Sequence, residues 1–264
     1  MIKAKGKRQK ARSWKCILLS FLVFPFIVLL LPATAQTRFY LPSSGAADVS
    51  PPFTLQASWD EVDNADRLKT VTTRIASAMT DKSEAKATTA NFRQLVRQYV
   101  SSPLGAQTIA STTTVKGTIR TLESAANDNV DKVSLKLLVV SNDGQTLRCT
   151  LLGLADYGPT NEWALSLTAR RIADGDTISA ACSITAGDRV VIEIGFNNTT
   201  AGTTITGTEN FGDNSATDLP DNETATAADN PFLELSQTLI FQPPAGGGPR
   251  RSVIARNLRP RPEP

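Results

Sequence analysis

Residues 132–152, KVSLKLLVVSNDGQTLRCTLL, decide the fold class. Apolar side chains alternate with polar ones over 133–139 and again over 147–151, on either side of Asn142-Asp143-Gly144. A period of two is typical of a strand with one buried face, and Asp-Gly supplies the positive φ of a tight hairpin turn. The stretch therefore predicts two antiparallel strands joined by that turn.

The same alternation extends outward along the chain. Residues 177–196 predict a second strand pair, in which Ile178, Ala180, Cys182 and Ile184 face one way, Ala186-Gly187-Asp188 forms the turn, and 190–196 continues the buried row. Further short strands are expected at 38–41, 67–74, 94–101, 113–122, 162–168, 203–208 and 232–241. About ten strands at this spacing predict an all-β domain over residues 36–242, a two-sheet antiparallel sandwich that is jelly-roll-like.

Residues 81–98 are the one stretch that suggests a helix. They are rich in alanine, and Phe92, Leu95, Val96 and Tyr99 lie near helical spacing. The residues from Leu95 to Val100 fit a strand equally well, so both interpretations stay open.

Residues 1–35 predict a signal peptide. Seven Lys and Arg precede an apolar run at 16–31, and Ala33-Thr34-Ala35 has the small-x-small pattern of a cleavage site. The run is somewhat longer than usual, so an uncleaved anchor is the alternative. We expect cleavage near Ala35 and a secreted, periplasmic or cell-surface protein that contacts the membrane only through its leader.

Charge is unevenly distributed along the chain. The leader holds 7 of the 28 Lys and Arg and none of the 25 Asp and Glu, and a Pro/Gly/Arg-rich segment at 243–264 holds five more Arg. Residues 36–242 therefore have a net charge of −8. An acidic domain argues against nucleic-acid binding, whose main contribution to affinity is phosphate neutralisation by Lys and Arg. The segment 243–264 is expected to be a disordered tail.

Two cysteines, Cys149 and Cys182, remain after cleavage, and both occupy inward positions of predicted strands. In an oxidising compartment they are candidates for a disulfide, although two separately buried thiols fit the pattern as well. Spacing alone does not establish that their Cα atoms are close enough.

The chain contains no histidine. Ser-His-Asp triads, Cys-His pairs and His-based zinc sites all depend on imidazole and are excluded. Catalysis by two carboxylates, as in glycoside hydrolases, does not need it. The acids in or beside predicted strands are Glu162, Glu193, Glu209 and Glu234, and the simpler interpretation is that they face solvent and protect the sheets from edge pairing.

Five acids in the stretch 213–229 suggest a calcium site: Asp213, Asp218, Asp221, Glu223 and Asp229. Carboxylate oxygens are the ligands that Ca²⁺ prefers, but the spacing does not match the helix-flanked calcium loop. A solvated loop is the alternative, and no other cofactor is expected.

Trp59 and Tyr157 are the candidate platforms for a carbohydrate ligand, because both lie beside turn residues. Trp163 alternates in register with Leu165 and Leu167 and is therefore expected in the core. Aromatic side chains more often pack inside a domain than bind ligands, so packing is the alternative for all three.

The run RFYLPSSGA at residues 38–46 resembles the opening of a group of uncharacterised, exported or phage-related β-sandwich proteins. Further matches are TTR at 72–74, VRQYVS at 96–101, GDRVVIEIG at 187–195 and ATDLP at 216–220. The resemblance implies a structural or surface module and assigns no catalytic residue. The leader and the basic tail depart from the phage-like pattern and argue against a role in a virion.

Three hypotheses follow. The first is a non-enzymatic structural or adhesive module outside the cytoplasm, with a glycan or another cell-surface polymer as its expected partner. The second is a carbohydrate-binding module that uses Trp59 or Tyr157. The third is a carboxylate-based glycoside hydrolase, which needs two acids about 5 to 10 Å apart in one cleft.

Overall fold

The computed structural model describes residues 36–87, 91–158, 161–198 and 204–243. Its described residues form 13 strands and no helix, so the all-β prediction is confirmed. The predicted signal peptide at 1–35, and the predicted tail apart from Pro243, lie outside these ranges. The strands are β1 (Thr37–Tyr40), β2 (Asp66–Lys69), β3 (Thr80–Lys86), β4 (Phe92–Val100), β5 (Gln107–Ile109), β6 (Thr114–Glu123), β7 (Val130–Val140), β8 (Leu147–Tyr157), β9 (Thr168–Thr177), β10 (Cys182–Ile184), β11 (Arg189–Asn198), β12 (Ile205–Phe211) and β13 (Phe232–Leu235).

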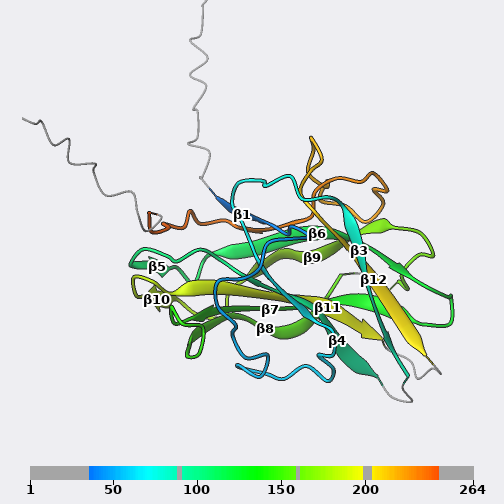
Figure 1. The fold of residues 1–264 in the computed structure, drawn as a ribbon, viewed down its shortest axis with the longest axis horizontal. Helices are drawn as coiled ribbons and strands as arrows, with labels where there is room; N and C mark the ends of the chain where they lie inside the picture. The colour runs from blue at the N-terminus through cyan, green and yellow to red at the C-terminus, as the bar shows by residue number, and fades with distance from the viewer. Residues whose placement is uncertain (1–35, 88–90, 159–160, 199–203, 244–264) are drawn as a thin grey trace, which may run out of the picture. The chain divides into compact units, whose positions relative to one another are not determined.

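Most of the strands belong to two large sheets. One sheet has the order β1-β13-β6-β12-β3, with β9 pairing with β6 as well, and the other has the order β2-β4-β11-β7-β8. Figure 1 shows β6 and β9 in one layer and β7, β8 and β11 in the other. Strands β5 and β10 form a small third sheet. Pairing is antiparallel except between β2 and β4, and the jelly-roll part of the expectation stays a prediction.

The hairpin at 132–152 forms as expected. Strand β7 pairs with β8 in a register that sets Val139 opposite Cys149, and the Gly144 amide donates to the Ser141 carbonyl at 2.8 Å. Gly144 has a φ of 79°, the left-handed conformation that glycine adopts without a steric cost.

The second predicted hairpin is wrong in its pairing. Residues 182–184 form β10, which pairs with β5, whereas β11 lies between β4 and β7. Ala180 is exposed, so the expected inward row is interrupted there. Alternation predicted the strands themselves, but the partners of β11 come from distant parts of the chain.

Two local assignments are also corrected. Residues 81–98 contain β3 and β4 instead of a helix, which favours the strand interpretation of Leu95 to Val100. Residues 162–167 are not a strand, because β9 begins only at Thr168. Strand β9 has no clean alternation, since register shifts against β6 place Ile172 and Ala173 in the core in succession.

The core lies between the two large sheets. Tyr99 of β4 contacts Phe211 of β12 with ring centroids 5.9 Å apart, which joins the two layers. Trp163 is 2% exposed and packs against Phe196 at 5.9 Å, so its predicted place in the core is confirmed. Among the described residues there is no helix long and apolar enough to span a membrane.

Candidate functional site

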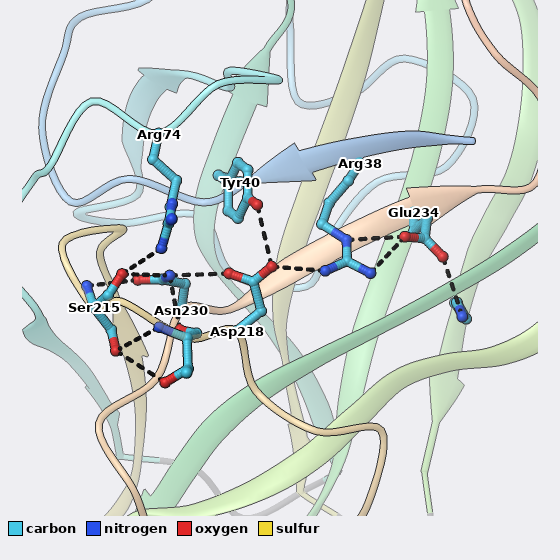
Figure 2. A network of polar contacts seen from close by, with 9 residues as sticks. Arg38, Tyr40, Arg74, Ser215, Asp218, Asn230 and Glu234 are labelled. Atoms are coloured by element: carbon cyan, nitrogen blue, oxygen red, sulfur yellow. Dashed lines mark hydrogen bonds and ion pairs between the residues drawn. The ribbon is translucent and has the colours of Figure 1, made fainter. Parts of the chain in front are cut away.

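Arg38 on β1 connects β13 to the loop at residues 213–230 (Figure 2). Its Nε and Nη2 donate to Glu234 Oε2 at 2.9 and 2.7 Å, and its Nη1 donates to Asp218 Oδ2 at 2.7 Å. Tyr40 donates to the same Asp218 oxygen at 3.1 Å, and Asn230 Nδ2 donates to Asp218 Oδ1 at 2.9 Å. We call Arg38, Tyr40, Asp218, Asn230 and Glu234 the Arg38 clasp.

The Arg38 clasp keeps the carboxylate of Asp218 charged. Burial raises the pKa of Asp218, but hydrogen bonds from Asn230, Arg38 and Tyr40 outweigh burial and bring the pKa below its ordinary value. The guanidinium also stacks on the Phe232 ring at 4.0 Å, a cation–π contact that fixes its orientation. The Arg38 clasp therefore acts as a rigid tie between the first strand, the last strand and the acidic loop.

The five acids of the proposed calcium site do not come together. No group of three or more His, Cys, Asp or Glu in the described residues is arranged to hold a metal ion. Each acid has other partners: Asp213 with Ile75 and Ser77, Asp218 with Arg38, Asp221 and Glu223 with Arg171, and Asp229 with Ser215 and Thr217. These five acids therefore do not form the expected calcium site, because turns and cations bind each carboxylate separately.

Trp59 is not a ligand platform. It is 5% exposed, and its indole Nε1 donates to Glu193 Oε2 at 2.6 Å. The same oxygen lies 2.7 Å from Lys136 Nζ, while Gln98 Nε2 donates to Glu193 Oε1 at 2.7 Å. The turn residues beside Trp59 indicated exposure, but their loop folds back over the five-stranded sheet and buries the ring.

Lys136 secures that loop. Its ammonium donates to the backbone carbonyls of Phe53, Leu55 and Ala57 at 2.9, 3.1 and 2.7 Å. Both Lys136 and Glu193 are 0% exposed, so the pair is a fully buried salt bridge. Sequence reasoning missed Lys136, although a lysine inside the apolar run of β7 was a usable signal.

Three of the four predicted strand acids are buried instead of facing solvent, and they do not form a catalytic pair: Glu193, Glu209 and Glu234. Glu234 lies between Leu233 and Leu235 of the core, and Glu193 lies between Ile192 and Ile194, so each points away from the core on its own sheet. Glu209 shares the inward side of β12 with Phe211. The three buried carboxylates therefore lie on three different sheet surfaces.

Glu162 is exposed and lies near Glu123 on the neighbouring strand β6. Burial, together with Glu162, raises the pKa of Glu123 to about 7. The electrostatic effect of Glu162 thus falls on Glu123, which was not among the predicted strand acids.

Tyr157 lines a pocket of about 420 Å³ at the end of β8. Asp156 and Gly158 come from the same end of that strand, and Arg171, Asp174, Asp176 and Glu223 complete the wall. Burial, with Asp176 and Asp156 nearby, raises the pKa of Tyr157 to about 12. The hydroxyl is therefore a neutral hydrogen-bond group at physiological pH.

The walls of this pocket are charged and mostly paired. Arg171 Nη1 donates to Asp174 at 2.8 Å, and its Nε donates to Asp221 at 2.9 Å. Asp156 accepts hydrogen bonds from Arg93, Ser134 and Asn197; burial raises its pKa, but these bonds outweigh burial and lower it overall. Four acids against one arginine make the pocket negative, which suits a neutral or cationic ligand.

Sequence reasoning found Tyr157 and Glu223 but not that they line one pocket. The missed residues Arg171, Asp174 and Asp176 belong to β9, whose register shifts hide the strand from a period-two pattern. The signal that was present is the sequence Ala173-Asp174-Gly175-Asp176, in which Gly175 has a φ of 82° and bends the strand.

Cys149 and Cys182 form a disulfide, with their Cα atoms 6.0 Å apart. The bond links β8 of the five-stranded sheet to β10 of the small sheet. Of the two arrangements that the spacing allowed, the structure has the paired one.

No protein-family model and no curated protein matches this chain. Among solved structures, infectious bursal disease virus Gt strain matches at 9% identity and a TM-score of 0.27, over 63% of this chain and 38% of that chain. The VP2 subviral particle of the same virus matches at 12% and 0.22, over 74% and 48%. A CocE/NonD family hydrolase from Staphylococcus aureus matches at 9% and 0.24, over 81% and 38%. The chain thus spans less than half of each of these three structures, and TM-scores this low carry no argument about function.

Proposed function

We propose that this chain is an exported, non-enzymatic β-sandwich module with a structural or adhesive role outside the cytoplasm. The observation that carries the proposal is the use of its buried charges. Glu193 and Glu234 bind lysine and arginine side chains that hold loops and strand ends, and Glu209 is enclosed in the core. A sandwich whose buried charged groups hold loops and strand ends in place suits a structural role better than catalysis.

Export is supported by the charged and apolar leader and by the disulfide. A bond between Cys149 and Cys182 persists in an oxidising compartment and is rare in the cytosol. Expression of the full chain with a C-terminal tag, followed by N-terminal sequencing of the exported protein, tests this part. We expect the mature chain to begin at Gln36; a cytosolic chain that retains Met1 would overturn it.

The pocket beside Tyr157 favours a second candidate function, the binding of a neutral glycan. A tyrosine ring offers a flat apolar surface, and carboxylates beside it accept hydrogen bonds from sugar hydroxyls. The surplus of acids disfavours uronic acids and sulfated sugars. This candidate makes the module adhesive without giving it catalysis.

A glycan array probed with the exported protein tests the adhesive role. We expect binding to neutral glycans that is lost in Tyr157→Ala and retained in Tyr157→Phe, which keeps the ring. Leu165→Ala serves as a matched control, because Leu165 is 62% exposed and does not line the pocket. Binding by Tyr157→Ala at the level of the unmodified protein would exclude this site, and release of reducing sugar from a bound glycan would overturn the non-enzymatic proposal.

A further inference from the structure

The outer face of the five-stranded sheet carries a surplus of positive charge in an otherwise acidic domain. Residues on this face are identified by the register: Val191 packs outside the main core, Val100 pairs with Val191, and Lys69 pairs with Val100. Side chains two residues along a strand share its face. The charged strand residues on this face include Arg67, Lys69, Arg93, Lys132, Lys136, Arg189, Asp156 and Glu193.

Five of these six cations have partners: Arg93 pairs with Asp156 at 2.8 Å, and Lys132 donates to the Gly158 carbonyl at 2.9 Å. Lys136 is held by Glu193 and by three carbonyls, and Arg67 donates from Nε to Gln98 Oε1 at 3.1 Å and stacks on the Phe53 ring at 3.8 Å. Arg189 is bound by backbone carbonyls. The ammonium of Lys69, in contrast, makes no ion pair or hydrogen bond to any residue in the described ranges.

Lys69 and Arg189 line the same pocket, which has a volume of about 410 Å³. The rest of its wall consists of Asp48, Ser102, Pro103, Gln242 and Pro243. The two cations come from β2 and β11, on either side of the end of β4. The prolines give the pocket an apolar side, and Asp48 is its single acid.

Arg189 is held in a fixed position at the base of this pocket. Its side chain is 9% exposed, its Nε donates to the Asn142 carbonyl at 3.0 Å, and its Nη1 donates to the Ser101 carbonyl at 3.0 Å. Nη2 has no hydrogen-bond partner among the described residues. A guanidinium that is oriented by its surroundings, with one nitrogen left over, is preorganised to bind an oxyanion.

Asp48 does not neutralise the two cations. Its carboxylate is 60% exposed and lies 3.3 Å from Arg189 Nη1, a nitrogen that already donates to Ser101. An exposed carboxylate at this distance interacts weakly because water screens it. Two cations, one of them without a partner, therefore face one loosely held acid.

We propose that this pocket binds a small oxyanion, a carboxylate or a phosphate group, between the Lys69 ammonium and the Arg189 guanidinium. The ligand accepts hydrogen bonds from Lys69 Nζ and Arg189 Nη2, and Pro103 and Pro243 contact its apolar part. The site is separate from the pocket beside Tyr157, with which it shares no lining residue. It also has the opposite charge preference, so its existence does not depend on the glycan proposal.

Isothermal titration of the exported full chain with sodium phosphate or sodium glucuronate tests the proposal, at pH 7 and low ionic strength. We expect saturable binding of at least one probe, and the preferred probe identifies phosphate or carboxylate as the chemistry. Lys69→Gln should weaken binding about tenfold, the loss of one close charge in a partly exposed site. Asp48→Asn should strengthen binding, because it removes the competing carboxylate.

The matched control is Lys132→Gln, which removes the same charge from the same sheet at a residue outside the pocket and bonded to the Gly158 carbonyl. It should bind like the unmodified chain, and each variant should melt within a few degrees of it. Binding should also weaken as salt is added, since mobile ions screen the two cations. The proposal is overturned if neither probe binds saturably, or if a folded Lys69→Gln chain binds as tightly as the Lys132→Gln chain.

Discussion

Glu209 behaves unlike an ordinary surface carboxylic acid. It is 0% exposed, and neither carboxylate oxygen has a hydrogen-bond partner in the described part of the chain. Burial raises its pKa to about 8, with the guanidinium of Arg97 opposing the rise. The strand register sets Lys82 opposite Glu209, but Lys82 Nζ bonds Glu84 at 3.1 Å and the Asn64 carbonyl at 2.9 Å. Glu209 is therefore protonated at neutral pH.

This state predicts a pH dependence of stability. The folded-state pKa lies above the unfolded value, so the folded chain keeps a proton that the unfolded chain releases between about pH 4.5 and 8. The contribution of Glu209 is thus complete below pH 4.5 and is lost as the pH rises through 8. Glu209→Gln keeps the shape without the ionisation, so it should melt higher than the unmodified chain at pH 8 and differ little at pH 4.5. Equal melting temperatures at both pH values would contradict this account.

Lys136 and Glu193 form a buried pair that stabilises the fold only while both partners are present. Lys136→Met leaves the Glu193 carboxylate buried without its cation, which typically costs about 3 to 5 kcal/mol. The double variant Lys136→Met/Glu193→Gln removes the stranded charge and should recover part of that loss. Urea denaturation measures both free energies of unfolding. Lys132→Met, on the same strand, is the control and should change stability by less than about 0.5 kcal/mol; a double variant less stable than the single one would contradict the pairing.

At the scale of strands, the sequence predicts local elements well and distant partners poorly. The β7–β8 hairpin was predictable because its turn and both strands lie in one continuous stretch, from Val130 to Tyr157. Strand β3, TDKSEAK, has no apolar alternation to reveal it, because it is an edge strand with mostly exposed side chains. Its partner β12 begins more than 100 residues later, and no local pattern encodes such a pairing.

The same distinction applies to the candidate site residues. Sequence reasoning placed Trp163 in the core correctly but for the wrong reason, because residues 162–167 form no strand and Leu165, in the same alternation, is 62% exposed. It misplaced Trp59 and Glu193, because the burial of Glu193 depends on a loop that crosses its strand from about 130 residues away. It could not anticipate that Lys69 and Arg189 share a pocket, because neither residue has a local partner that marks it.

The disulfide is an element-scale tie between β8 and β10, and it predicts a measurable loss on reduction. Cys149 and Cys182 are 33 residues apart, and closing a loop of that length in the unfolded chain stabilises the folded state by about 4 kcal/mol in the chain-entropy model. Cys149→Ser/Cys182→Ser should therefore lower the free energy of unfolding by a similar amount. Urea titration with and without dithiothreitol checks this: reductant should destabilise the unmodified chain and leave the double variant unchanged.

Across the whole molecule, polar ties secure what the core alone does not hold. The RFYLPSSGA and ATDLP runs supply Arg38, Tyr40 and Asp218 to the Arg38 clasp. The VRQYVS and GDRVVIEIG runs supply Gln98 and Glu193 to the buried network around Lys136. The motifs that carry the resemblance thus build the scaffold, which agrees with a structural role more than with catalysis.

The Arg38 clasp joins the two ends of the described domain, so the position of the N-terminus should control global stability. Strand β1 begins at Thr37, two residues after Ala35 at the predicted cleavage site, and pairs with β13 along its whole length. A chain that begins at Gln36 keeps every contact of β1 and should fold. A chain that begins at Leu41 loses Phe39 from the core, leaves Glu234 without Arg38 and opens the edge of β13. We expect the longer chain to unfold cooperatively in calorimetry and the shorter chain to lack a cooperative transition or melt at least about 10 °C lower, since even 1 kcal/mol shifts Tm by several degrees in a domain of this size.

Arg38→Met in the longer chain separates the loss of the ion pairs from the loss of strand β1, because it breaks the ion pairs while β1 stays paired. It should fall between the two chains, and a Leu41 chain as stable as the Gln36 chain would show that the clasp contributes nothing to the fold.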